Sequence, residues 1–217
     1  MTPVINIIIE ISCLIASIFF LKNDLSKFSR LTIFYLTIVC LTEISGLIYI
    51  KTFHKSNAWL YNISIIFEAA YIAYGLYAAL IAFTKKSSPI IFSFLGVFCL
   101  CYLIEISNHG FFKFNTVTLS VMSILIIMIS LYYFLLLQKD KNPINLKYHW
   151  QFWWVTGVLI YYFGGTVYNL CLYFLLDDIP KPYKLLVYVM IFLNLILYSF
   201  WAYSFLCRSR QQKLSGS

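Results

Sequence analysis

Seven apolar stretches separated by short polar loops dominate this chain, and each is long enough to cross a bilayer, which takes about 20 helical residues. Backbone polar groups surrounded by lipid must be paired within their own segment, so spans of this kind are expected to be helices. The sequence therefore predicts an all-α, polytopic membrane protein whose residues 1–207 form one seven-helix bundle. The expected helices cover about residues 4–21, 31–50, 59–83, 90–107, 116–137, 151–176 and 184–206.

Composition agrees with this class. Only 11% of the residues are charged and 62% are hydrophobic, whereas soluble domains carry about 25% charged residues. Residues 208–217 are expected to form a short cytoplasmic tail, and their last four, LSGS, resemble a cloning remnant. The net charge of +8 could indicate nucleic-acid binding in a soluble protein. Here the cations lie in loops between apolar spans, so we expect the lipid bilayer as a partner and no nucleic acid.

The loops also predict an orientation. Lys and Arg are concentrated in residues 22–30, 85–86, 139–147 and 208–213, which all fall on one side of a seven-span chain. Short loops rich in Lys and Arg stay in the cytoplasm, so we expect the N-terminus outside and the C-terminus inside. No basic residue precedes the first span, which favours a retained helix over a cleaved signal peptide. The expected location is the plasma membrane, or the inner membrane of a bacterium.

The stretch 59–83 has two contrasting faces and is predicted to be the central helix. One face is polar or small, and the other is bulky. Lipid solvates bulky side chains well, whereas small residues are favoured where helix backbones approach closely. The polar or small face is Tyr61, Ser64, Glu68, Tyr71, Gly75, Ala78 and Ala82, and the bulky face is Ile63, Phe67, Tyr74, Tyr77 and Ile81.

All four glutamates of the chain fall inside predicted spans. A carboxyl at the bilayer centre costs about 2.5–3.5 kcal/mol, so such residues are expected to serve a site or to pair with one another. With the N-terminus outside, the glutamates and several asparagines fall in the outer half of the membrane. They predict a polar pocket that opens outward, although glutamates acting only as interhelical hydrogen-bonding groups remain the alternative. The predicted ligand-binding residues are Glu10, Glu43, Glu68, Asn62, Asn169, Asn194, Tyr71 and Tyr168.

A second group lies near the predicted outer surface. Glu105 and His109 are four residues apart and share a helix face, and His54 follows the second span on the same side. Together with Glu43 they could bind Zn²⁺ or another divalent ion. Ordinary interfacial histidines are the favoured interpretation, and no other cofactor is expected.

Several short motifs resemble those of small, uncharacterised seven-helix proteins of bacterial membranes. They are Thr42-Glu43, Trp59-Leu60-Tyr61-Asn62, Glu68 and Phe152-Trp153-x-x-Thr156-Gly157. The resemblance covers most of the chain and implies the same fold, but it implies no particular activity.

Three functions remain open from the sequence. The favoured one is a receptor or sensor that binds a small cationic or hydroxyl-rich ligand from outside and signals through a separate partner, with Glu43 and Glu68 as the main acceptors. The second is a proton- or cation-coupled transporter, for which Gly164-Gly165 could break the sixth helix. The third is a metal-dependent hydrolase at the outer face, although catalysis has little support in the sequence. A purely structural subunit is a further possibility.

Overall fold

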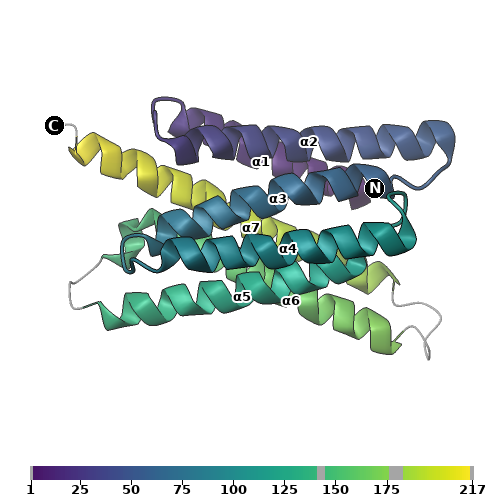
Figure 1. Cartoon of the computed structure of the whole chain (residues 1–217). Coiled ribbons are helices and arrows are strands. Elements are labelled where there is room, and N and C mark those ends of the chain that lie inside the picture. The colour runs from purple at the N-terminus through teal and green to yellow at the C-terminus, as the bar shows by residue number, and fades with distance from the viewer. Residues whose placement is uncertain (1, 141–144, 176–182, 216–217) are drawn as a thin grey trace.

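The computed structural model describes residues 2–140, 145–175 and 183–215. These residues form seven long α-helices and one short 3-10 helix, so the all-α prediction is confirmed. The long helices run roughly side by side, with the two termini at opposite ends of the bundle (Figure 1). The helices are α1 (Thr2–Leu21), α2 (Lys27–Phe53), α3 (Ala58–Leu80), α4 (Ser87–His109), α5 (Thr116–Lys139), η1 (Leu146–Tyr148), α6 (Trp150–Leu175) and α7 (Tyr183–Ser215).

Six of these helices, α1 to α5 and α7, are long enough and apolar enough to cross a membrane. The described part of α6 does not meet that criterion. Its sequence from Trp150 to Asn169 is rich in Trp, Tyr, Gly and Thr in place of aliphatic residues. The six helices are consistent with the predicted membrane protein, and α6 is the helix with the most mixed chemistry.

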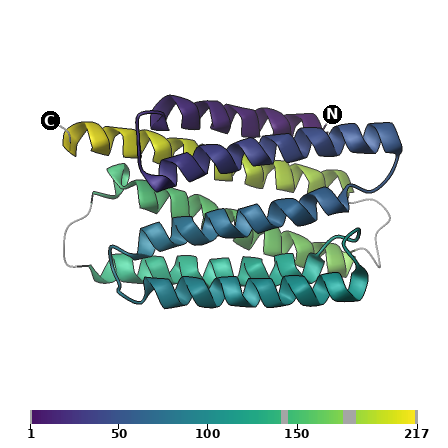
Figure 2. The same ribbon diagram turned by 45° about the horizontal axis from the view of Figure 1, so that its top comes forward.

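Helix α3 is central, as its sequence predicts. It packs against α2, α4, α5 and α6, and Figures 1 and 2 both show it between α2 and α4. Half of its most apolar window (50%) is buried, against at most 33% for the other candidate spans. Gly75 and Tyr71 on its small and polar face are buried, while Phe67 on the bulky face is 40% exposed. The two faces are used as predicted at these positions, whereas Ala82 of the small face is exposed and Tyr74 and Tyr77 of the bulky face pack partly against the core.

Aromatic side chains fill the bundle core around the part of α3 that follows Glu68 in the chain. Trp154 and Trp201 stack with ring centroids 5.7 Å apart, and Tyr35 stacks on Tyr71 at 4.3 Å. Gly75 makes this packing possible, because a Cβ atom there would overlap the Trp154 ring. We refer to these rings as the aromatic plug, which consists of Phe28, Tyr35, Tyr71, Trp150, Trp154 and Trp201.

Helix α7 continues to Ser215, so the prediction that it ends near Leu206 is wrong. Its last turns are held by the loops that they pass. Arg208 forms an ion pair with the buried Asp24 carboxylate, and its Nη2 donates to Ser26 Oγ at 2.8 Å. Gln211 donates to the Tyr148 carbonyl at 2.8 Å. The sequence pattern suggested a tail because the apolar periodicity stops, whereas these polar contacts extend the helix.

The Asp24–Arg208 pair joins the α1–α2 loop to α7 and also touches the aromatic plug. The Arg208 guanidinium lies 4.5 Å from the Trp150 ring centroid and 5.2 Å from that of Phe28. Burial alone would raise the pKa of Asp24. Hydrogen bonds from Ser29, Arg208 and the Ser26 backbone, together with the Arg208 charge, hold that pKa well below its usual range. The pair is therefore ionised at neutral pH.

Replacing Asp24 with Asn is expected to destabilise the protein by about 3 kcal/mol, at the low end for a buried pair because Arg208 is partly exposed. A group whose pKa is lowered in the folded state adds stability above its ordinary pKa of about 3.9, and this stability is lost as the pH falls through the lower, folded value. The difference in free energy of unfolding between wild type and Asp24→Asn should therefore persist at mildly acidic pH and shrink below about pH 4. Thermal unfolding in detergent across this pH range measures it.

The matched variants are Arg208→Gln and the double variant Asp24→Asn/Arg208→Gln. Since the two side chains contact each other, the double variant should lose less stability than the sum of the single losses. Strictly additive losses would contradict a direct pairing.

Candidate ligand-binding pocket

A cavity of about 320 Å³ lies inside the bundle, on the side of the aromatic plug that faces the N-terminus. Five helices supply its polar lining: α1, α2, α3, α6 and α7, with one further serine from α5. Tyr35 and Trp201 of the plug also line it, so the plug forms one wall. The polar lining side chains are Asn6, Glu10, Thr42, Glu43, Tyr61, Ser64, Glu68, Ser123, Tyr161, Tyr162, Tyr168, Asn169, Asn194 and Tyr198.

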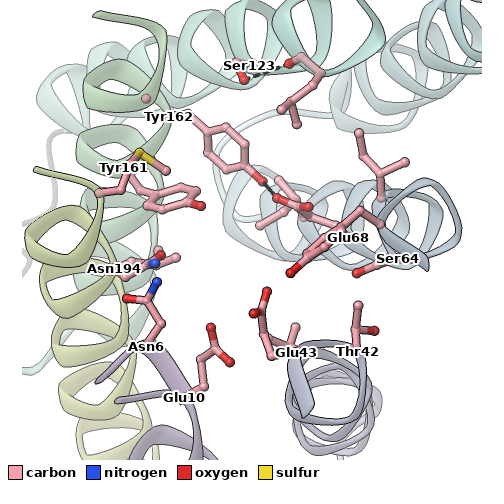
Figure 3. A pocket seen from close by; sticks show the side chains of 18 of the residues that line it. Asn6, Glu10, Thr42, Glu43, Ser64, Glu68, Ser123, Tyr161, Tyr162 and Asn194 are labelled. Carbon is pink, nitrogen blue, oxygen red and sulfur yellow. Dashed lines mark hydrogen bonds between the residues drawn. The ribbon is translucent and has the colours of Figure 1, made fainter. Parts of the chain in front are cut away.

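Three carboxyl groups from three helices converge in this pocket. Figure 3 shows Glu10 of α1, Glu43 of α2 and Glu68 of α3 pointing toward a shared space, with Asn6 and Asn194 beside Glu10. Asn6 and Glu10 are four residues apart and therefore share one face of α1. Glu10 is only 4% exposed, and its Oε2 has no hydrogen-bond partner among the described protein atoms; the same is true of Asn6 Oδ1. Two buried acceptor atoms of residues that line the cavity are thus left without a partner among the described protein atoms.

Tyrosine hydroxyls hold two of these carboxyls in place. Tyr162 of α6 donates to Glu68 Oε1 at 2.5 Å, and Tyr61 of α3 hydrogen-bonds to the Glu43 carboxyl. Among the residues that the structure describes, Glu10 has no comparable donor. Each tethered carboxyl keeps acceptor capacity for a further group, because a carboxylate has two oxygens and about four lone-pair directions.

The described lining contains no Lys, Arg or His. Carboxylates in a largely apolar bundle lose hydration, and Glu43 also repels Glu10, so the three carboxyls cannot all be charged without compensation. Compensation has two sources, protons on the carboxyls or a cation between them. The pocket is therefore suited to bind a positive charge or a hydrogen-bond donor.

Most of the predicted ligand-binding residues are brought together. Glu10, Glu43, Glu68, Tyr168, Asn169 and Asn194 all line the cavity, whereas Asn62 and Tyr71 do not. Tyr71 belongs to the plug, where its hydroxyl accepts from Trp154 Nε1 at 3.1 Å and lies 3.2 Å from Thr32 Oγ1.

Asn62 has a different role from the predicted one. Its amide nitrogen donates to the carbonyls of Phe111 and Lys113 at 2.8 and 2.7 Å, and its Oδ1 accepts from the Asn115 backbone at 3.2 Å. The side chain thereby fastens the α4–α5 loop to α3. A buried asparagine satisfies such loop groups well because it has both donors and an acceptor.

Tyr162 is the site residue that the sequence pattern missed. The heptad stripe of α6 passes through Tyr161 and Tyr168, and Tyr162 lies about 100° away around the helix. Both tyrosines nevertheless line the cavity, because its wall spans more than one heptad stripe. Adjacent tyrosines in a helix poor in aliphatic residues are the signal that could have indicated this wider face.

The predicted metal-ligating residues do not form a set of three ligands, although His109 lies near enough to Glu105 for their charges to interact. Glu105 instead accepts from the Val117 and Thr118 backbone nitrogens at 3.0 and 2.7 Å and so caps the start of α5. His109 is exposed at the end of α4, and His54 is the exposed C-cap of α2 with a φ of 52°. Among the described residues, no group of three His, Cys, Asp or Glu side chains could hold a metal ion.

Helix α6 runs without interruption through Gly164 and Gly165, so the break suggested for a transporter is not present. Gly164 instead allows close packing, because a Cβ there would overlap the Leu193 side chain of α7. Gly165 has open space beside it and lines the cavity. The two glycines thus bring α7 close to α6 and leave room in the pocket.

Comparison with known proteins gave no match to a family, to a characterised protein or to a solved structure.

Proposed function

We propose that this protein is an integral membrane receptor or sensor that binds a small organic ammonium ion between Glu10, Glu43 and Glu68. The observation that carries the proposal is the convergence of three carboxyl groups in a cavity whose described lining has no cation. A positively charged ligand would supply the missing compensation and would bind through charge-assisted hydrogen bonds.

The aromatic lining favours an organic cation over a bare metal ion. Tyr161, Tyr162, Tyr198 and Trp201 surround the carboxyls, and ammonium groups are attracted to the faces of such rings. A cavity of about 320 Å³ is at the lower end of the range of small-molecule sites. The ligand class is thus an amine of a few carbon atoms, or one with a hydroxyl that Asn194 or Thr42 could bond.

Two observations favour a receptor over a transporter. The aromatic plug fills the bundle beyond the pocket, with Trp154 fully buried, and no described carboxyl continues from the pocket through that region. Helix α6 is also unbroken, whereas transporter sites typically use interrupted helices. Proton-coupled transport remains the second candidate, since buried carboxyls commonly relay protons.

The plug also offers a physical connection to the opposite end of the bundle. Trp201 lines the pocket and stacks on Trp154; Trp154 in turn packs edge-on against Phe28, whose ring lies under Arg208. A ligand that moved Trp201 would disturb packed rings up to Arg208. We propose that this end faces the cytoplasm, by the distribution of Lys and Arg, and that a separate partner protein there receives the signal.

The proposal is tested with purified protein in phosphatidylcholine nanodiscs and a series from methylammonium to tetramethylammonium and choline. At constant ionic strength, at least one of these ions should raise the unfolding temperature saturably, while sodium should not, because a ligand that binds only the folded state stabilises it. Equal effects of sodium and every organic ion would contradict the proposal. Uptake of the stabilising ion into sealed proteoliposomes would instead favour the transporter.

A further inference from the structure

A second cavity lies at the other end of the bundle, away from the glutamates. It has a volume of about 670 Å³ and lies where the end of α1 meets the C-terminal part of α7. These two helices pack against each other. None of its lining residues belongs to the glutamate pocket, so it is a separate site.

The lining of this cavity is divided by chemistry. Phe19, Phe20 and Leu206 form its apolar part, and Phe19 is 69% exposed. Lys22 and Arg210 contribute two exposed cations, which lie two to four residues beyond the apolar lining residues of their own helices. Apolar walls that end in cations at a helix end are expected at the boundary between acyl chains and headgroups.

The two cations have no acidic partner in the cavity, whose described lining contains no Asp or Glu. The nearest acid along the chain, Asp24, is buried and already bound by Arg208, Ser26 and Ser29. Asp24 therefore compensates the charge of Arg208. The charges of Lys22 and Arg210 are not compensated within the cavity lining and are available to a ligand.

We propose that this cavity binds an anionic phospholipid. Its phosphate lies between Lys22 and Arg210, where the ammonium and guanidinium groups donate charge-assisted hydrogen bonds. One acyl chain runs along Phe19 and Leu206. A free anion would use only the charged part of the cavity. A lipid would also cover the face of Phe19 that the Phe20 ring, 5.2 Å away, leaves exposed, so a lipid fits better.

Native mass spectrometry tests this with the full chain in mixed micelles that contain phosphatidylglycerol and phosphatidylcholine. Wild type should retain phosphatidylglycerol preferentially. The variants Lys22→Gln and Arg210→Gln should each reduce that preference about fivefold, as expected for one cation near an anionic lipid surface, and the double variant should lose most of it.

The matched control is Lys51→Gln/Lys55→Gln, which removes two exposed cations from the opposite end of the bundle. This control should keep the preference. A double Lys22/Arg210 variant that still prefers phosphatidylglycerol, or an equal loss in the control, would overturn the proposal. A third arm adds excess inorganic phosphate: retained lipid supports the site, whereas replacement by phosphate shows a free-anion site and overturns it.

Discussion

Replacing Glu68 with Gln is expected to weaken binding of the stabilising ammonium ion by at least about thirtyfold, because one charge-assisted contact of about 2 kcal/mol or more is lost. The fold should survive. Gln keeps a side-chain oxygen at the position where Glu68 Oε1 accepts from Tyr162, and it has nearly the same volume. Titration of the nanodisc-embedded variant, with its unfolding temperature recorded in the absence of ligand, separates lost affinity from lost structure.

His109→Gln is the matched control for this experiment. His109 is exposed and does not line the pocket, so ammonium binding should be unchanged, whereas a metal site at the C-terminal end of α4 would be damaged. A folded Glu68→Gln protein with wild-type affinity would remove Glu68 from the site and favour the view that the buried glutamates only join helices.

Replacing Gly75 with Val is expected to cause the largest loss of stability, about 3 kcal/mol or more. A Cβ at this position would overlap several atoms of the Trp154 ring. That ring cannot retreat, because it is fully buried and stacked on Trp201. Overpacking of a filled core commonly costs about 1–3 kcal/mol, and occasionally more. The midpoint of thermal unfolding in detergent measures the loss.

Gly96→Val provides the control, because a Cβ at Gly96 meets no atom within 4 Å. Its effect should be small. A second variant, Gly75→Val/Trp154→Leu, should recover part of the loss, since the smaller side chain leaves space for the new methyl groups. Similar losses for Gly75→Val and Gly96→Val would show that the Gly75–Trp154 contact does not limit stability.

Sequence periodicity was sufficient for the features that depend on one helix at a time. Helix α3 has its bulky face outward and its small face against neighbours because lipid and helix packing select different side chains, and this contrast is visible along a single segment. The convergence of Glu10, Glu43 and Glu68 could likewise be anticipated, because a membrane fixes the depth of each carboxyl from its distance to the span end.

Features that depend on a loop or on the side chains of a neighbouring helix could not be predicted from the periodicity of a single helix. Asn62 has the same depth and polarity as the pocket residues, but its side-chain amide is hydrogen-bonded to the backbone of the α4–α5 loop. Tyr71 is directed to the plug because Trp154 presents an indole N–H to it. Likewise, the continuation of α7 depends on Asp24, which lies more than 180 residues earlier in the chain.

The pocket also has a consequence for the biogenesis of the protein. Its lining combines Asn6 and Glu10 near the start of the chain with Asn194 and Tyr198 near its end. During synthesis the glutamates of α1, α2 and α3 therefore enter the membrane long before their last polar neighbours exist. Only when α7 closes against α1 does the site become complete. The cation that we propose for this pocket would stabilise that final closure selectively, because it contacts residues from both ends of the chain.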